Sequence, residues 1–438
     1  MPKKKTALTI EERLQQALVS AEEQPYEVPE NWVWVRLGDV NKYISKSVNP
    51  ISEPDKIFEL YSVPSMVDNY PEIIAGSDIG SSKQSVCKKD VLLCKINPRI
   101  NRVWKVSQFT DNELIASSEW IIIRNNHIDA NYLMYCFQSK YFREFMLSNV
   151  SGVGGSLMRA QPKYVQTYPI PLPPLSEQQR IVERIEELFA KLDEAKERLQ
   201  EVADSFAVRK AAILHKAFTG ELTKQWRREN GVSDESWEEK KLSEITENQD
   251  SKRIPLSKSQ RDNMNRIYDY YGASGIIDKV DDYIFEGKKL LIGEDGANLV
   301  TRSKDIAFIA DGKYWVNNHA HILDVKDTVL LMYLCHYINN MDLIPYVTGS
   351  AQPKLTQAKM NNIKIFLPTL SEQHEIVRLI DDLLARERKA QQATEQALAS
   401  IDLMKKSILA RAFRGELGTN KASEASALEL LKQVLAEN

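Results

Sequence analysis

Apolar residues recur with an alternating four-and-three spacing along two long stretches of the chain. This spacing is typical of the seam of a left-handed coiled coil, and a short surface helix would not sustain it. The sequence therefore predicts two long amphipathic helices. Their seam residues are Ile181, Ile185, Leu188, Leu192, Ala195, Leu199, Val202 and Phe206 in the first stretch, and Ile376, Ile380, Leu383, Ala390, Ala397 and Ile401 in the second.

The two stretches are copies of each other. Residues 175–222 align with residues 370–417 at a constant offset of 195, with 19 identities in 48 positions and no gap. Each copy opens with LSEQ and closes with GEL. In the first copy, Ser176 and Gln179 predict a capping box, and Gly220 predicts the end of the helix.

A helix with one long apolar stripe must cover that stripe. We expect each copy to pack against the other, antiparallel and with approximate two-fold symmetry. Two unrelated bundle helices, or a coiled coil between two chains, are the alternatives. The second seam is weaker, because Glu387 and Thr394 stand where Leu192 and Leu199 stand in the first copy.

A segment of different texture precedes each helix. Short apolar runs such as DVLLCKI, EWIIIR, KLLIGE and IAFIA are separated by Gly, Asp, Asn and Pro, a pattern that predicts mixed sheets with a few helices, of α/β or α+β class. The segments share landmarks, because NWVWVRLGD resembles SWEEKKLSE, YLMYCFQS resembles LLMYLCHY, and GGSLMRAQPK, which ends at Lys163, resembles VTGSAQPK, which ends at Lys354. The whole unit is therefore predicted to be duplicated.

These landmarks divide the chain into six parts. We expect an N-terminal helical segment (1–30), a first domain (31–171), a first spacer helix (172–222), a second domain (223–366), a second spacer helix (367–417) and a C-terminal helical tail (418–438). In the first part, Thr9 and Glu12 predict a capping box. In the tail, Leu428, Leu431 and Leu435 form one stripe. Either end could pack on its home domain, on the other end or on a partner protein.

Composition narrows the class of protein. The chain has 438 residues with 43% hydrophobic and 27% charged, and it has no apolar run near the roughly 20 residues of a membrane span. We therefore expect no membrane segment, and without an export signal we expect a cytoplasmic location. The net charge of -3 argues against coating nucleic acid by charge alone. Cys87, Cys94, Cys136 and Cys335 are predicted to be buried free thiols.

The paired segments LPPLSEQQRIVERIEELFAKLD and LPTLSEQHEIVRLIDDLLAR, closed by KAFTGEL and ILARAFRGEL, resemble the specificity subunit of type I restriction-modification enzymes. The resemblance implies two target-recognition domains, each of which reads half of an interrupted double-stranded DNA sequence, with the helices as spacer and docking surface. It also implies two methyltransferase subunits and, in the full complex, two restriction (motor-nuclease) subunits. S-adenosylmethionine, ATP and Mg²⁺ would then bind to those partners and no cofactor to this chain. His374 departs from the first copy, where the capping-box Gln stands.

Catalytic signatures are scarce in the sequence. No GxxxxGK[ST] loop for a nucleotide and no Gly-rich turn for S-adenosylmethionine occurs, and INPRI at 96–100 lacks the rest of an amino-methyltransferase motif. His319 and His321 would share one face of a strand and could hold a metal, but without a third ligand we favour a hydrogen-bonded structural role. Glu294 and Asp295 are interpreted as a turn. We predict no catalytic residue and no metal site.

Candidate DNA-binding residues are polar or cationic side chains in Gly-bearing or Asn-bearing loops. Arginine and lysine suit guanine edges or phosphates, and glutamine suits adenine, although surface salt networks or turns would explain the same residues. The candidates are Arg99, Arg102, Lys105, Ser156, Arg159, Gln161 and Lys163 in the first domain, and Tyr271, Ser274, Asn298, Arg302, Ser350, Gln352 and Lys354 in the second.

The sequence thus predicts a non-catalytic DNA-recognition subunit held by a coiled-coil spacer. A helical scaffold that does not read DNA is one alternative, and a standalone modifying enzyme is another. A specificity subunit of a methyltransferase-only or type II-like system is a third. The target bases cannot be inferred from composition or spacing.

Overall fold

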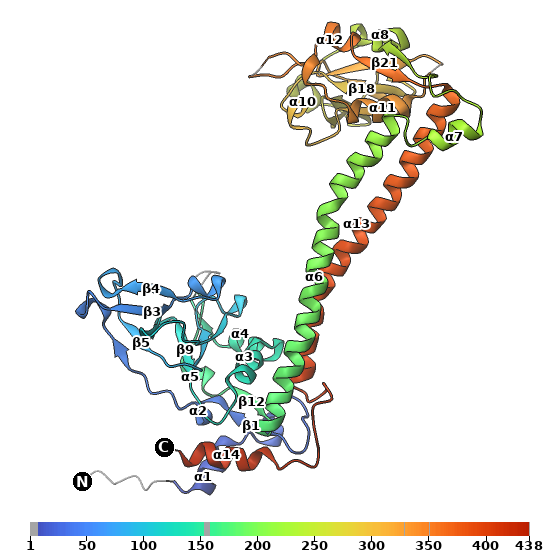
Figure 1. Cartoon of the computed structure of the whole chain (residues 1–438). Coiled ribbons are helices and arrows are strands. Elements are labelled where there is room, and N and C mark those ends of the chain that lie inside the picture. Colours follow the sequence, from blue (N-terminus) through green and yellow to red (C-terminus); the bar gives the residue numbers. More distant parts are fainter. Residues whose placement is uncertain (1–7, 153–157, 328, 350, 438) are drawn as a thin grey trace. The chain divides into compact units, whose positions relative to one another are not determined.

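The computed structural model describes residues 8–152, 158–327, 329–349 and 351–437. The chain forms two compact units, one made of residues 1–198 with 397–438 and the other of residues 199–396. Each unit holds a sheet-containing domain, called here the first and the second domain, together with part of each long helix (Figure 1). The predicted fold class, mixed helix and sheet with two similar domains and two long helices, is confirmed.

The first unit contains a five-stranded sheet of order β2-β5-β8-β3-β4, a three-stranded sheet of order β7-β6-β9, and the ribbons β1-β12 and β10-β11, as far as its described residues extend. The strands are β1 (Val33–Arg36), β2 (Ser47–Val48), β3 (Ile57–Tyr61), β4 (Glu72–Ala75), β5 (Lys83–Ser85), β6 (Val91–Cys94), β7 (Val103–Lys105), β8 (Glu113–Ala116), β9 (Trp120–Ile123), β10 (Val150–Ser151), β11 (Arg159–Ala160) and β12 (Pro169–Leu172). The short helices are α1 (Ile10–Ala17), α2 (Leu37–Val40), α3 (Ala130–Gln138), α4 (Lys140–Ser148), α5 (Pro162–Val165) and α14 (Ala427–Ala436).

The second unit, over its described residues, contains four-stranded sheets of order β14-β21-β18-β19 and β16-β15-β20-β17, and the ribbon β13-β22. The strands are β13 (Glu238–Lys241), β14 (Thr246–Asn248), β15 (Tyr268–Gly272), β16 (Gly275–Val280), β17 (Phe285–Glu286), β18 (Lys289–Gly293), β19 (Ala307–Ala310), β20 (Lys313–Val316), β21 (Ala320–Val325) and β22 (Lys364–Leu367). The short helices are α7 (Lys224–Glu229), α8 (Leu242–Ile245), α9 (Lys258–Arg261), α10 (Asn298–Thr301), α11 (Leu331–Asn340) and α12 (Gln357–Asn361).

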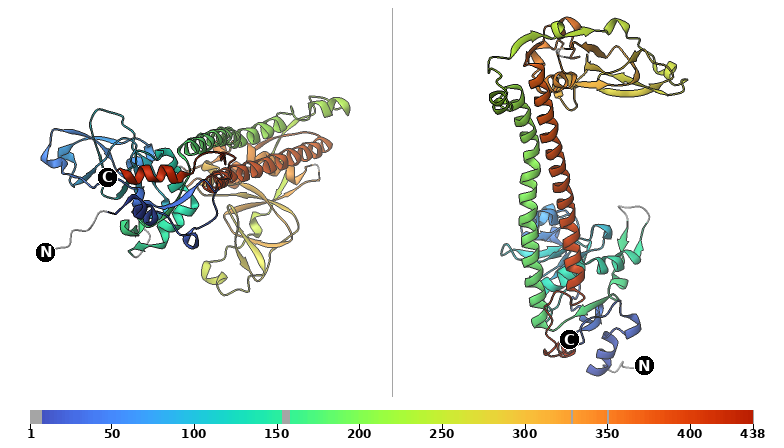
Figure 2. Two further views of the ribbon diagram at one scale, coloured as in Figure 1. Left: turned by 90° about the horizontal axis from the view of Figure 1, so that it is seen from below. Right: turned by 90° about the vertical axis from the view of Figure 1, so that its right-hand side faces the viewer.

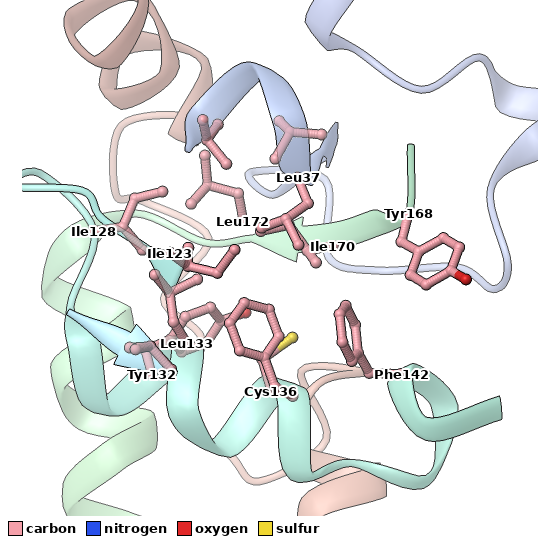
Figure 3. Packing of buried hydrophobic residues seen from close by; sticks show 14 of the residues in the cluster. Leu37, Ile123, Ile128, Tyr132, Leu133, Cys136, Phe142, Tyr168, Ile170 and Leu172 are labelled. Carbon is pink, nitrogen blue, oxygen red and sulfur yellow. The ribbon is translucent and has the colours of Figure 1, made fainter. Parts of the chain in front are cut away.

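The apolar runs noted in the sequence become buried strands. DVLLCKI contains β6, EWIIIR contains β9, KLLIGE contains β18 and IAFIA contains β19, as predicted. In the first domain, β12 and the helices α3 and α4 enclose one side of this core, where Tyr132, Cys136 and Phe142 face Ile170 and Leu172 (Figure 3). Asp129 begins α3 by accepting a hydrogen bond from the Tyr132 amide at 2.9 Å.

The two long helices are α6 (Leu175–Phe218) and α13 (Leu370–Ala412), and both units contain a stretch of each. In the first unit, Ile181 and Ile185 near the start of α6 share a buried apolar cluster with Leu409 and Ala412 at the end of α13. Further along α6, Asp193 pairs with Lys405 of α13 at 2.5 Å, while Arg180 pairs with Glu424, twelve residues beyond the end of α13. Residue numbers therefore rise along α6 as their partners' numbers fall, so these stretches run antiparallel. Figures 1 and 2 show the stretches side by side.

The second unit repeats this arrangement. Ile376 and Ile380 of α13 share a buried apolar cluster with Leu214 and Ala217 of α6. Beyond α6, Thr223 donates a hydrogen bond to Glu372 in the first turn of α13. Within each unit the predicted antiparallel pairing of the two copies is confirmed.

Burial follows most of the predicted seam. Ile181, Ile185, Phe206, Ile376, Ile380 and Ile401 are buried, and Leu188, Leu192, Leu199, Leu383 and Ala397 are half-buried. Three predicted seam positions are wrong, because Ala195, Val202 and Ala390 are exposed. Two of these are alanines, whose side chains are too short to reach across the seam. Thr394 is buried, and its hydroxyl donates to the Ala390 carbonyl at 2.9 Å, which satisfies its polar group.

The predicted capping box at Ser176 is wrong, because α6 already begins at Leu175 and places Ser176 inside its first turn. The LSEQ motif instead ties the helix to its domain through the next two residues. Gln178 accepts a hydrogen bond from the Asp129 amide at 2.8 Å and donates one to the Pro173 carbonyl at 2.9 Å. Gln373 makes the same two bonds, from the Leu330 amide at 2.8 Å and to the Pro368 carbonyl at 2.9 Å.

The glutamates of the two LSEQ motifs are fully buried and receive different donors. Glu177 accepts from Trp32 Nε1 at 2.7 Å and from Asn420 Nδ2 at 2.8 Å. Glu372 accepts from Thr223 Oγ1 and from Arg227 Nη1, each at 2.6 Å. In each unit, therefore, the segment that follows one long helix closes over the start of the other long helix.

Both ends of the described chain lie in the first unit. The predicted capping box is present, since Glu12 N donates to Thr9 Oγ1 and Thr9 N donates to Glu12. Helix α14 packs against α1 and α2, and buries Leu430, Leu431, Val434 and Leu435 (Figure 1). Leu428, which was predicted on the same stripe, is only half-buried.

The predicted end of the first long helix is confirmed, and one of the four cysteine predictions is wrong. Gly220 follows α6 with φ of +76°, as expected for a residue that ends a helix. All four cysteines are free thiols, but Cys87 is exposed and so was wrongly predicted as buried. Among the described residues, the structure has no helix that is both long and apolar enough to cross a membrane.

Candidate nucleic-acid interface

The end of strand β6 and a later segment form a backbone frame in the first domain. Ile96 bridges Arg159, the Ala160 amide donates to the Lys95 carbonyl at 2.8 Å, and the Asn97 amide donates to the Met158 carbonyl at 2.8 Å. We call residues 94–97 with 158–160 the strand-end frame of the first domain. It pairs the backbone of Arg159 with that of Ile96, next to Asn97 at the start of the loop that contains Arg99 and Arg102.

The second domain contains the same strand-end frame, made of residues 293–296 with 353–355. Asp295 bridges Lys354, the Leu355 amide donates to the Glu294 carbonyl at 2.8 Å, and the Gly296 amide donates to the Pro353 carbonyl at 3.0 Å. Asn97 and Gly296 follow the bridges with φ of +48° and +105°, a left-handed region that asparagine and glycine tolerate best. The hydrogen bonds thus equate Arg159 with Lys354.

This equivalence corrects two sequence alignments. The shared string AQPK aligned Lys163 with Lys354, but Lys163 lies in α5, four residues beyond the frame position. Similarly, the sequence aligned Tyr135 with Tyr333, whereas the Tyr132 hydroxyl donates to the Pro171 carbonyl as the Tyr333 hydroxyl does to the Phe366 carbonyl. Three residues make nearly one helical turn, so the apolar pattern could not distinguish the two registers.

In the first domain most of the described DNA-binding candidates lie at the strand-end frame or in the segments that adjoin it, and Lys105 does not. Arg99 is exposed and Arg102 half-buried in the loop after β6, and Arg159 is half-buried, with its Nε 3.4 Å from Glu119 Oε2. Gln161 and Lys163 follow directly, at the start of α5. Lys105 lies apart from this group.

Lys105 occupies the far end of β7. Its ammonium donates to Asn131 Oδ1 at 2.5 Å, and Lys105 lines a hollow with Leu175 and Gln179 at the start of α6. Lys163 is exposed, and its ammonium lies 4.6 Å from the centre of the Tyr164 ring. Ser156 and Ser350, two further candidates, lie outside the described residues.

Three candidates of the second domain are used by the fold. Tyr271 is buried, with its ring stacked on Phe308 at a centroid distance of 5.9 Å. Asn298 accepts hydrogen bonds from the Lys304 amide and from Ser303, which closes its own loop. The Arg302 guanidinium donates to the carbonyls of Asn339 in the last turn of α11 and of Met341 directly after it. These three side chains are not available to a ligand.

The remaining candidates of the second domain are accessible. Ser274 is exposed in the turn between β15 and β16, and Gln352 is exposed in the loop before the strand-end frame. The Lys354 side chain is 49% exposed. Backbone bonds in both directions between Thr348 and Lys354, each of 2.8 Å, close that loop at its base.

A network of charged side chains contacts Lys354 on the side that faces the protein interior. It consists of Asp250, Arg253, Glu294, His321 and Lys354. Glu294 and His321 are buried, the Asp250 and Arg253 side chains are 7% and 14% exposed, and Lys354 is exposed. Lys354 Nζ lies 3.1 Å from Glu294 Oε1, and Arg253 Nη1 lies 2.6 Å from Glu294 Oε2. Arg253 Nη2 in turn lies 3.4 Å from Asp250. His321 Nδ1 lies 2.5 Å from Asp250, and its Nε2 donates to the Leu355 carbonyl at 2.7 Å.

The network holds both of its carboxylates in the ionised form. Burial alone would raise the pKa of Asp250, but the hydrogen bond and charge of His321, together with interactions with the Ile322 amide and Asn248, outweigh burial, so the pKa lies below its ordinary value. Burial likewise opposes ionisation of Glu294, yet the hydrogen bonds from Arg253 and Lys354 and the charge of His321 together lower its pKa. Both groups are therefore anions at neutral pH.

The sequence reading of Glu294 as a simple turn residue was incomplete, and Asp250, Arg253 and Glu119 were not considered. The network residues come from four separate segments, so no local motif could have revealed them. Ligand atoms of Asp250, Glu294 and His321 lie within 4.8 Å of one another, a spacing that would suit a metal ion. Arg253 and Lys354, however, already supply the cations for Glu294. His319 and His321 do not converge, since His319 lies in a turn and bonds to Asp295 at 2.8 Å.

Exposed cations adjoin this network. The segment from Asp250 to Arg266 carries Lys252, Lys258 and Arg266 at exposed positions. It is fastened to the sheet, because Trp315 Nε1 donates to the Ile254 carbonyl at 2.6 Å and Arg261 pairs with Asp278 at 2.8 Å. A fixed backbone with projecting cations is suited to binding a polyanion such as DNA.

Comparisons with known proteins show which family the chain resembles. The family described as "Type I restriction modification DNA specificity domain" matches residues 29–204 and again residues 234–397. A putative type I restriction enzyme specificity subunit of Haemophilus influenzae is 41% identical over 147 residues, which are 33% of this chain and 37% of that protein.

Two further relatives cover more of the chain. The type I restriction enzyme StySPI specificity subunit of Salmonella potsdam is 26% identical over 340 residues, 71% of this chain and 72% of that protein. The crystal structure of the HsdS subunit from Thermoanaerobacter tengcongensis matches with a TM-score of 0.67 at 21% identity, and the match covers 90% of this chain and 99% of that one. At this identity the structural match shows a shared fold.

Proposed function

This chain belongs to the type I restriction modification DNA specificity domain family, and from that membership we propose that it reads two half-sites of one double-stranded DNA target. Each domain reads one half, and the bases between the halves are ignored. The chain is the non-catalytic specificity subunit of a type I restriction-modification complex. One observation carries the proposal: two domains of low sequence similarity offer a cation, Arg159 or Lys354, from the same strand-end frame.

In the first domain the proposed contact residues surround this frame. Arg99, Arg102 and Arg159 are suited to guanine edges or phosphates, Gln161 to adenine, and Lys163 to a phosphate. In the second domain, Ser274, Gln352 and Lys354 contact bases or phosphates, and Lys252, Lys258 and Arg266 bind the phosphate backbone. Tyr271, Asn298 and Arg302 are not among the proposed contacts, because the fold uses their side chains.

The long helices are proposed to fix the spacing of the half-sites and to dock partners. Their antiparallel pairing within each unit would resist a change in spacing. Apolar side chains left exposed on them support the docking role, since Val208 is 70% exposed and Leu403 is 64% exposed. We propose two methyltransferase subunits as partners, with two restriction subunits in the full complex. S-adenosylmethionine, ATP and Mg²⁺ would bind to these partners.

Selection from a pool of random duplexes tests the proposal. The full chain, with the proteins that co-purify with it, should enrich a motif with two defined halves and an undefined centre. A scaffold that does not read DNA would enrich no motif. If the chain were a standalone modifying enzyme, the purified chain alone would bind S-adenosylmethionine in equilibrium dialysis, and we expect no such binding.

A further inference from the structure

We propose that Glu294 is a positioning residue, which aims the Lys354 ammonium at DNA from the second domain. This inference rests on the proposed function and adds to it a residue that need not touch DNA itself. Glu294 Oε1 lies 3.1 Å from Lys354 Nζ, and the glutamate side chain is 11% exposed, whereas the lysine side chain is 49% exposed. The carboxylate thus lies behind the cation, on its buried side.

The buried charges behind Glu294 keep its carboxylate in place. Arg253 Nη1 contacts Glu294 Oε2 at 2.6 Å and also donates to the Ala320 carbonyl at 2.8 Å. Backbone bonds fix the same residues, because the Glu294 amide donates to the His319 carbonyl and the Leu355 amide to the Glu294 carbonyl, each at 2.8 Å. A lysine side chain is flexible, so a fixed anion beside its ammonium reduces the rotamer entropy lost on binding.

Arg253, the second cation that contacts Glu294, allows Lys354 to bind DNA. An ammonium that turns toward a phosphate or a guanine acceptor shares its charge with the ligand. If Lys354 were the only partner of Glu294, its turn toward DNA would leave a buried carboxylate without a neighbouring positive charge. An unpaired buried charge is strongly destabilising. Arg253 remains on the other oxygen of Glu294, so the carboxylate stays paired while Lys354 engages DNA.

The first domain offers an internal comparison. Its frame cation, Arg159, pairs with Glu119 at 3.4 Å, and these side chains are 42% and 29% exposed. Strand pairing of Cys94 with Trp120 and of Gly293 with Ala320 places Ile121 where the second domain has His321. Lys95 occupies the position of Glu294. Among the residues that the structure describes, the shared backbone frame therefore carries such a charge network in the second domain and not in the first.

The substitution Glu294→Gln distinguishes a positioning role from a simple effect of charge on DNA binding. Removal of a negative charge beside a DNA surface should strengthen binding, because the phosphates are anionic. If Glu294 positions Lys354, Glu294→Gln should instead weaken binding to the selected target by about tenfold, equivalent to about 1.4 kcal/mol. Lys354→Gln should weaken it by a similar factor.

The test is a double-mutant cycle on the full chain with its co-purifying proteins. Fluorescence anisotropy would measure the dissociation constants of the selected duplex for wild type, Glu294→Gln, Lys354→Gln and the double variant. We expect the double variant to bind as Lys354→Gln does, since Glu294 acts through the lysine. Glu286→Gln, at an exposed position of the same domain, is the matched control and should bind as tightly as wild type or more tightly.

Two results would overturn the inference. One is target binding by Glu294→Gln that equals or exceeds that of wild type. The other is an equal loss from Glu294→Gln in the wild-type and Lys354→Gln backgrounds. If Glu294→Gln does not fold, Glu294→Asp keeps the buried charge, withdraws it from Lys354 and enters the same cycle. Failure of the wild type to select any split motif would instead refute the proposed function, on which this inference rests.

Discussion

Arg209 of α6 pairs with Glu387 of α13, with Nε and Oε2 2.9 Å apart, at the point where a glutamate interrupts the apolar seam of α13. The same guanidinium lies 4.5 Å from the centre of the Phe206 ring. The glutamate thus contributes to the pairing of the helices within this unit. The first copy has the half-buried Leu192 at the equivalent position, so one copy carries an apolar side chain there and the other carries an ion pair between antiparallel helices.

We expect Glu387→Ala to destabilise the second unit by less than about 1 kcal/mol, because the pair is partly exposed and such pairs contribute little. Glu387→Leu should be neutral or stabilising, since it restores the apolar seam. Urea unfolding followed by tryptophan fluorescence would measure both changes. A loss of several kcal/mol in Glu387→Leu would show that the ion pair itself holds the helices together.

The paired glutamines of the LSEQ motifs should matter more than their neighbours. Gln178→Ala leaves the Asp129 amide and the Pro173 carbonyl without partners, and should cost about 2 kcal/mol. The exposed neighbour Gln179→Ala is the control and should change stability by less than about 0.5 kcal/mol. Thermal unfolding compares the two, and hydrogen exchange at the Asp129 amide should accelerate only in Gln178→Ala.

The buried charge network should make the free energy of unfolding decrease at acidic pH. The pKa values of Asp250 and Glu294 lie below their ordinary values in the folded chain. The two carboxylates therefore stabilise the fold fully when the pH lies above their pKa values in the unfolded chain. This stabilisation is lost as the pH falls through their pKa values in the folded chain. Arg253, Lys354 and His321 are the charged or titratable groups that face the two carboxylates.

Glu294→Gln should accordingly lower the free energy of unfolding by about 3 kcal/mol at pH 7, and by less as the pH falls below 4. Urea unfolding at a series of pH values measures this convergence. Glu286→Gln again serves as the control and should give a curve parallel to that of wild type. Curves for Glu294→Gln that stay equally far below wild type down to pH 2 would contradict the ionised state of Glu294.

Gly349 and Gly312 have nearly the same φ but different surroundings. Replacing each with alanine therefore distinguishes the effect of backbone strain from the effect of a steric clash within the loop. Gly349 has φ of +82°, and a Cβ there would lie 2.6 Å from the Gln352 carbonyl oxygen. Gly312 has φ of +83°, and a Cβ there would meet no atom within 4 Å. Both Gly→Ala variants should lose about 1 kcal/mol of stability from strain.

Only Gly349→Ala should also distort the loop that carries Gln352 and Lys354. We expect it to weaken binding to the selected duplex about tenfold, whereas Gly312→Ala binds as wild type does. Anisotropy titrations would compare the two variants. Equal affinities would place the 349–354 loop outside the DNA interface.

The proposed spacing role predicts how insertions behave. Seven residues added to both α6 and α13 keep the seam in register, because a heptad is two turns of a coiled coil. Such a variant should fold and select half-sites with a longer gap. One residue added to α6 alone rotates everything beyond it by about 100°, and should abolish cooperative folding. Selection and thermal unfolding would show the two outcomes.

The sequence revealed the parts of the fold that depend on periodicity. The Ile181 and Ile376 stripes predicted two helices, and the Thr9 capping box and Gly220 predicted helix ends, because each of these depends on neighbouring residues. Ser176 was misread because the glutamine and glutamate that follow it bond to distant segments. The seam failed at Val202, since an isolated stripe does not show how closely its partner approaches.

The candidate site was harder to infer for a related reason. The string AQPK aligned Lys163 with Lys354 by chance, whereas the backbone bonds that equate Arg159 with Lys354 join residues far apart in the sequence. Tyr271 and Arg302 have the side chains that suit nucleic acids, but the fold uses both. Glu294 received only a local explanation because Arg253, its strongest partner, stands 41 positions earlier.

Residues 397–438 belong to the same unit as residues 1–198, although they are translated after the whole of the second unit. The Ala427 amide donates to the Asn31 carbonyl at 2.8 Å and Asn420 Nδ2 donates to the Glu177 carboxylate, so the first domain is covered by residues that are translated after the second unit. Residues 199–396, by contrast, form one uninterrupted unit. During synthesis the middle of the chain can therefore mature while the nascent amino-terminal part still exposes apolar surface. A stalled translation product would carry that surface into the cell, where chaperones and proteases recognise it.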